Sequence, residues 1–233
     1  MNHRRVAILV LLLASPTLFG QTPQPYAARP GTSISSSARL HLSAEQQTEL
    51  AMSTAPREIT QNASLYILSE HGYKLARKGT NGFSCLVEHQ YLDTYEPVCY
   101  DPEGSKTLLL ARFMREELRA AGVNEQEVSR RTDEAFAQGK LKAPSKAGFA
   151  YMMASDQRVY NPATGQVVHG PSQAPAHLMF YAPYAKKEDF GGLPGPHTPF
   201  LLFEGRPDTF LIVIPSLMAG ANASPGGGEK HQH

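Results

Sequence analysis

The order of its segments constrains the fold of this chain more than any other feature. β-type segments with alternating apolar residues run from Ala63 to Tyr100, two amphipathic helical segments follow, and β-type segments return from Phe149 to Ile214. Strands, then a helical pair, then more strands is the order of an α+β domain. We therefore expect one α+β domain over residues 63–215. Its sheet should be largely antiparallel, with a meander, a later hairpin and an inserted helical pair.

Turn residues define the first group of strands. His71–Gly72 and Asn81–Gly82 separate three β segments, and the third segment, Phe83 to His89, carries Cys85. Asn-Gly pairs accept the positive φ of tight turns, so consecutive segments should pair as a meander. Pro97–Tyr100 is expected to lie beside the third segment.

The later β-type segments are read in the same way. Phe149–Tyr160 is expected to form one strand and Leu178–Tyr184 another. Pro199–Glu204 and Thr209–Ile214 flank a Gly-Arg-Pro-Asp turn, which predicts a second hairpin.

The two helices between these strand groups are amphipathic. Residues at helical spacing predict two inner faces: Leu110, Phe113, Met114, Glu117, Leu118 and Ala121, then Val128, Thr132, Ala135 and Phe136. Gly122 suits a left-handed helix end, so a short link should join the helices as a hairpin. Charged residues are expected to form a solvated outer face: Arg112, Arg115, Glu116, Arg119, Glu125, Arg130, Arg131 and Asp133.

The first twenty residues have the pattern of a secretory signal peptide. Arg4 and Arg5 precede an apolar run from Val6 to Ala14, which is too short to cross a bilayer. Cleavage is expected after Gly20. The pattern predicts export from a bacterial cell, to the periplasm or the medium.

Removal of this leader leaves a nearly neutral chain. Losing Arg4 and Arg5 leaves 20 basic and 21 acidic residues, a balance that favours binding neither to nucleic acid nor to a membrane surface. No second run of eighteen or more apolar residues follows, so no membrane insertion is expected after cleavage. Residues 21–62 should form a flexible lead with a short helix near Ala44–Ser53, and residues 216–233 a disordered tail.

Two cysteines, Cys85 and Cys99, follow the leader. An even number of cysteines in an exported protein favours a disulfide, here closing a loop of about fifteen residues. Two buried thiols or a metal site that includes cysteine are the alternatives. The wide spacing does not match the close cysteine pairs of zinc ribbons. We expect a Cys85–Cys99 disulfide that joins two neighbouring β segments.

Several short stretches resemble a group of uncharacterised exported bacterial proteins. These stretches are Gly79-Thr80-Asn81-Gly82-Phe83 with Cys85, Cys99-Tyr100-Asp101 with Glu103-Gly104-Ser105, Ala150-Tyr151-Met152 and His177-Leu178-Met179-Phe180-Tyr181-Ala182-Pro183-Tyr184. The resemblance covers roughly Ala63 to Pro215. It implies an exported single domain, and it implies no activity and no functional residue.

The sequence contains none of the catalytic motifs His-Glu-x-x-His, Gly-x-Ser-x-Gly and Ser-x-x-Lys, and no phosphate-binding loop. Histidine provides the candidate metal site, since imidazole binds zinc when neutral. A zinc site would have to be assembled by folding from His89, His177 and His197. We expect no cofactor, with zinc as the alternative.

The candidate ligand-binding residues are His177, Tyr181 and Tyr184, beside a Gly191–Gly195 loop that could act as a lid. On a strand, His177 and Tyr181 share a face and could line a polar pocket. The alternative is that this strand packs in the core.

These patterns favour an exported module that binds a small molecule or an envelope protein without catalysis. One alternative is an exported hydrolase, with or without a metal ion, that uses His71, Glu88, His89, His177 or His197. The other alternative is an envelope interaction protein.

Overall fold

The computed structural model describes residues 42–91, 93–161, 165–192 and 198–216. The expected signal peptide, most of the expected flexible lead and nearly all of the expected tail lie outside these residues. The described residues fold as an α+β domain, as the sequence predicts. They form a mostly antiparallel eight-stranded sheet and a separate two-stranded sheet.

The strands of the large sheet have the spatial order β2-β1-β3-β4-β5-β8-β10-β9. In chain order they are β1 (Ser64–Ser69), β2 (Gly72–Arg77), β3 (Ser84–Glu88), β4 (Glu96–Tyr100), β5 (Phe149–Met152), β8 (His177–Tyr181), β9 (Phe200–Leu202) and β10 (Phe210–Val213). The small sheet pairs β6 (Arg158–Asn161) with β7 (Gln166–His169). The helices are α1 (Ala44–Ser53), α2 (Arg57–Thr60), α3 (Pro102–Lys106), α4 (Leu108–Ala120), α5 (Glu125–Ala137) and the 3-10 helix η2 (Lys187–Phe190).

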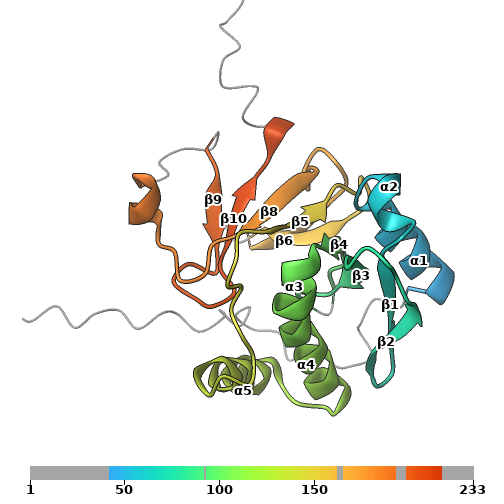
Figure 1. The fold of residues 1–233 in the computed structure, drawn as a ribbon, viewed down its shortest axis with the longest axis horizontal. Helices are drawn as coiled ribbons and strands as arrows, with labels where there is room; N and C mark the ends of the chain where they lie inside the picture. Colours follow the sequence, from blue (N-terminus) through green and yellow to red (C-terminus); the bar gives the residue numbers. More distant parts are fainter. Residues whose placement is uncertain (1–41, 92, 162–164, 193–197, 217–233) are drawn as a thin grey trace, which may run out of the picture.

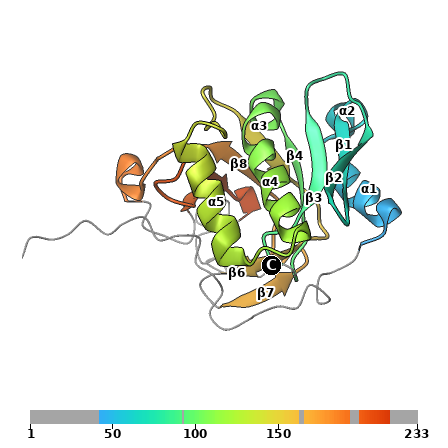
Figure 2. The same ribbon diagram turned by 90° about the horizontal axis from the view of Figure 1, so that it is seen from below.

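Strand alternation gives the large sheet two apolar faces. Cys85 on β3 belongs to a core cluster with Ala51 of α1, whereas the next residue, Leu86, belongs to a cluster with Leu108 and Leu109 of α4. Successive strand residues point to opposite faces. Helices α1 and α2 therefore lie on the other side of β1 and β3 from α4, as both ribbon views show (Figures 1 and 2).

The folded part of the chain begins before Ala63. The expected helix α1 is present, and Ser43 and Gln46 form its capping box. This helix is not part of a loose lead, because Ala51 is fully buried and the hydroxyl of Thr54 donates to the Pro97 carbonyl oxygen at 2.9 Å. The domain therefore includes residues from 42 onward.

The first strands are not ordered as a meander. β2 pairs with β1 as expected, but β3 lies beside β1, in parallel, and not beside β2. The link after β2 crosses the start of β1, where the Thr80 amide donates to the Asn62 carbonyl oxygen at 2.8 Å. These backbone hydrogen bonds between the link and the segment before β1 place β3 on the side of β1 opposite to β2.

The expected strand Phe149–Tyr160 is divided into two strands. The chain leaves the sheet at Met153, whose amide donates to the Thr54 carbonyl oxygen at 2.9 Å. It then forms β6, which pairs with β7 in a hairpin. The later hairpin of β9 and β10 is confirmed.

The inserted helices form a hairpin, with Gly122 at a φ of 77° in the link. The inner face of α5 is confirmed, since Val128, Thr132 and Ala135 are buried. The inner face of α4 was predicted only in part: Phe113 and Met114 pack against the core clusters, as expected. Leu110 is 45% exposed, whereas Arg115 and Glu116 are buried, so part of the expected solvated face points inward.

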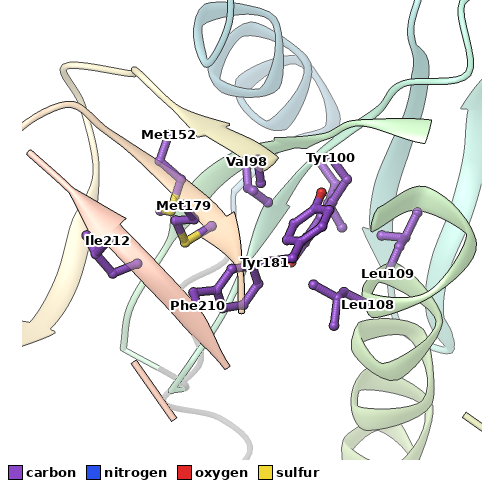
Figure 3. Packing of buried hydrophobic residues seen from close by; sticks show 11 residues of the cluster. Val98, Tyr100, Leu108, Leu109, Met152, Met179, Tyr181, Phe210 and Ile212 are labelled. Atoms are coloured by element: carbon purple, nitrogen blue, oxygen red, sulfur yellow. The ribbon is translucent and has the colours of Figure 1, made fainter. Parts of the chain in front are cut away.

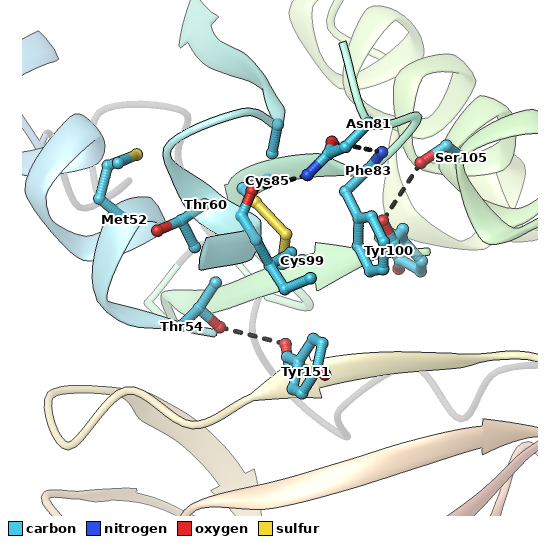
Figure 4. Close-up of a disulfide and its surroundings, with 12 residues drawn as sticks. Met52, Thr54, Thr60, Asn81, Phe83, Cys85, Cys99, Tyr100, Ser105 and Tyr151 are labelled. Carbon is cyan, nitrogen blue, oxygen red and sulfur yellow. Dashed lines mark hydrogen bonds between the residues drawn. A yellow bond between two sulfur atoms is a disulfide. The ribbon is translucent and has the colours of Figure 1, made fainter. Parts of the chain in front are cut away.

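The predicted disulfide joins Cys85 and Cys99, which face each other across β3 and β4 (Figure 4). Both cysteines are buried in the cluster beneath α1. The bond therefore fastens β3 to β4, the strand that leads into the helical insertion.

Replacing both cysteines by alanine should lower the free energy of unfolding by about 3 kcal/mol, because the unfolded chain regains the freedom of a closed loop. Urea unfolding of the oxidised protein and of the double variant measures the difference. Adding a reductant should shift the wild-type midpoint and leave the variant unchanged. A reductant effect on the variant would contradict this explanation.

Candidate functional site

A cavity of about 480 Å³ lies between α4 and the inner face of the large sheet. Its described lining comes from six adjacent strands, β3 through β9 in spatial order, together with α4, β2, β6 and β7. This volume lies in the range of sites for small organic molecules.

One wall of the cavity is apolar. Met152, Met179, Phe210 and Ile212 line it from β5, β8 and β10, and these side chains gather on neighbouring strands (Figure 3). Antiparallel pairing sets Met179 directly opposite Ile212. Since alternate residues of a strand share a face, the pairing register itself builds a continuous apolar surface.

The β6–β7 hairpin and the segment after it close part of the cavity. Val159 and Val168 line it from the two strands of this hairpin. Gln157, just before β6, is fully buried, and its amide nitrogen donates to the Ala174 carbonyl oxygen at 2.8 Å. This bond holds Ala174, which also lines the cavity, to the base of the hairpin.

The wall opposite the apolar one is charged. A stripe of α4 side chains, spaced three or four residues apart, faces the sheet and consists of Arg112, Arg115, Glu116 and Arg119. Each of these arginines lies in an ion pair. The pairs are Arg112–Glu88 (3.1 Å), Arg115–Asp208 (2.7 Å), Arg119–Glu125 (2.8 Å) and Arg119–Glu116.

Glu96 differs from the other carboxyl groups of the cavity. It faces Glu88 across β3 and β4, and both residues line the cavity. Its Oε1 atom is buried and has no hydrogen-bond partner among the described residues. Burial and, after it, the Glu88 carboxylate raise the pKa of Glu96 to about 8, although Thr94, Arg112 and Arg119 act in the opposite direction.

The three predicted ligand-binding residues are not brought together. His177 lines the cavity. Tyr181 is a core residue whose hydroxyl donates to Asp101 at 2.9 Å, and burial, followed by the Asp101 carboxylate, raises its pKa. Tyr184 is 60% exposed at a φ of 62°. Neither tyrosine is among the cavity-lining residues. Most of the expected lid lies outside the described residues.

The histidines proposed as zinc ligands are held apart. His89 and His177 both line the cavity, but β3 and β8 are three strand spacings apart, which is about 14 Å. Each ring donates from Nδ1 to a backbone carbonyl oxygen, of Thr94 and Pro175 respectively. His197 lies outside the described residues. No group of three His, Cys, Asp or Glu side chains in the described part of the chain could hold a metal ion.

The most unusual side chains of this cavity were missed from the sequence. Glu96 stands between Tyr95 and Pro97, just before the predicted segment Pro97–Tyr100, and the stripe on α4 has the spacing of an ordinary solvated face. One signal was present: Leu108 and Leu109 begin α4 on the same side as Arg112 and Arg115, and both leucines are buried. Charged residues that continue an apolar stripe indicate a buried polar wall.

Comparison with known proteins gives no match to a protein-family model, to a curated protein or to a solved structure. No helix of the described residues has the length and apolar character needed to cross a membrane.

Proposed function

We propose that the protein is an exported ligand-binding module that holds a small amphipathic molecule in the cavity beneath α4, without catalysis. The observation that carries this proposal is the contrast between the walls, with methionine and aliphatic side chains on one side and ion pairs on the other. Methionine adapts to ligands of irregular shape, and fixed polar groups orient them. The leader pattern and the disulfide support export.

The structure favours binding over the metal-assisted hydrolase that the sequence also allows. Glu88, His89 and His177 line the same cavity, but the two histidines lie on distant strands, and Arg112 pairs with Glu88. His71 is exposed in the turn between β1 and β2. The cavity thus gathers these residues without arranging them as a metal site or as a nucleophile with its base.

Filling the cavity should remove binding. Ile214 lines it, and Ile214→Trp introduces a larger side chain, whereas the adjacent Val213 lies outside the lining and Val213→Trp is the matched control. We expect Ile214→Trp to weaken binding of the uncharged fluorescent probe N-phenylnaphthylamine by about tenfold, equivalent to about 1.4 kcal/mol. Saturable binding with one site per chain is expected for the wild type and the control. Equal binding by both variants would disprove the proposal.

A further inference from the structure

One carboxyl group in the described lining of the cavity takes no part in its ion pairs. The three arginines of α4 pair with Glu88, Asp208, Glu116 and Glu125. No ion pair involves Glu96 in the described part of the chain, although its Oε1 atom is buried in the cavity wall. A buried polar atom without a partner costs about 1–3 kcal/mol. A ligand atom in the cavity is the group that can supply this partner.

The charge state of Glu96 decides which ligand atom fits. The titratable and charged groups that share its cavity are Tyr73 on β2, Glu88 and His89 at β3, Arg112, Arg115, Glu116 and Arg119 on α4, Tyr160 on β6 and His177 on β8. The Oε1 atom of Glu96 is buried and the residue faces Glu88 across β3 and β4, and both features favour the neutral carboxylic acid over a second buried negative charge. The pKa of about 8 agrees with a neutral group at neutral pH. A carboxylic acid donates one hydrogen bond through its O–H. The complement of that donor is a hydrogen-bond acceptor on the ligand.

We propose that Glu96 recognises an uncharged oxygen acceptor, such as the carbonyl of a ketone, ester or amide, on the ligand whose apolar body lies against Met152, Met179 and Ile212. This inference rests on the proposed function and specifies its ligand. A carboxylate ligand at Glu96 would face the Glu88 carboxylate, and the nearby Arg112 and Arg119 are already engaged in ion pairs with other carboxylates. An ammonium ligand would have to displace the proton of Glu96 while facing Arg112 and Arg119.

The experiment uses three probes of equal chain length: methyl heptyl ketone, nonylamine and nonanoate. Calorimetric titration of the full mature chain measures their affinities across pH. The ketone should bind most tightly near neutral pH and about tenfold more weakly at about pH 9 than at about pH 7, since ionisation of Glu96 removes the donor. Burial lowers the pKa of His177, so this ring is neutral throughout that range and does not contribute.

A pair of variants separates Glu96 from general effects of pH. Glu96→Gln keeps an N–H donor and cannot ionise, so ketone binding should stay within about threefold of wild type near neutral pH and lose its pH dependence. Glu58→Gln makes the same chemical change on α2, at an exposed position outside the cavity lining. It should behave as the wild type at every pH.

The outcomes distinguish this inference from the proposed function. Ketone binding that is abolished by Ile214→Trp but independent of pH and of Glu96→Gln would overturn the inference and leave the cavity as the binding site. The inference would also be overturned if nonylamine bound more tightly as the pH rises, or if nonanoate bound more tightly than the ketone at any pH. If none of the probes binds, or if Ile214→Trp changes nothing, both proposals fail.

Discussion

Replacing Asp208 by asparagine should lower the free energy of unfolding by about 3–5 kcal/mol, the cost of breaking a buried ion pair at one partner. Asp208 is 1% exposed and accepts hydrogen bonds from Arg115 at 2.7 Å and from Arg206 at 3.1 Å. Asparagine has nearly the same shape but no charge. Arg115 and Arg206 would then stay buried without this counter-charge. The cost of keeping their charges away from water without it accounts for most of the expected loss of stability.

A second carboxylate in the same network provides the control. Asp133 on α5 pairs with Arg206 at 2.6 Å, but its side chain is 39% exposed. Water screens such a pair, so Asp133→Asn should cost at most about 1 kcal/mol. Urea unfolding of both variants gives the comparison. Equal losses would show that Asp208 owes its effect to local packing and not to the charges that it neutralises.

The contribution of Asp208 to stability depends on pH in a definite direction. Burial alone would raise the pKa of Asp208, but the charges of Arg115, Arg206 and Arg112 outweigh it and hold the pKa well below its usual range. Its contribution is therefore present above the pKa of the unfolded chain, about 3.9, and is lost as pH falls below that value. Wild-type stability should fall more steeply in this acidic range than that of Asp208→Asn.

Short sequence patterns were sufficient to predict those helix ends and strands that depend on interactions between neighbouring residues. The capping box at Ser43, the left-handed Gly122 and the β segment that carries Cys85 could all be predicted, because each depends on residues near in sequence. The position of β3 depends instead on backbone hydrogen bonds between the link after β2 and the segment before β1. Nothing in the turn residues distinguishes that crossing from a meander.

The candidate site was less predictable because its polar residues have partners far away in the chain. Arg115 becomes buried through Asp208, which lies 93 positions later, and α4 taken alone shows only an amphipathic pattern. Glu96 gains its environment from a strand pair and a helix together. His177, one of the candidate residues, lines the cavity because strand alternation places it on the same face as Met179. The same alternation placed Tyr181 on that face, but farther along, where α3 covers it.

Gly79→Ala should cost more than about 3 kcal/mol, at the upper end of overpacking effects. Gly79 lies in the link that crosses the start of β1, and its amide donates to the Ser64 hydroxyl at 3.0 Å. A β-carbon at this position would stand 2.2 Å from the backbone nitrogen of Ser64 and 2.5 Å from the Asn62 carbonyl oxygen. These are backbone atoms that also pair with the link, so they cannot move away without breaking the crossing.

The control separates this steric cost from the conformational cost of replacing a glycine. Gly122 has a φ of 77° and open space around its α-carbon, so Gly122→Ala should cost only about 1–2 kcal/mol for the left-handed backbone. The φ of Gly79 lies outside that region, which leaves contact with the backbone as the reason for its larger effect. Thermal or urea unfolding of the two variants gives the ranking. A smaller loss for Gly79→Ala than for Gly122→Ala would mean that the link does not pass this closely over β1, and the parallel pairing of β1 with β3 would then lose its explanation.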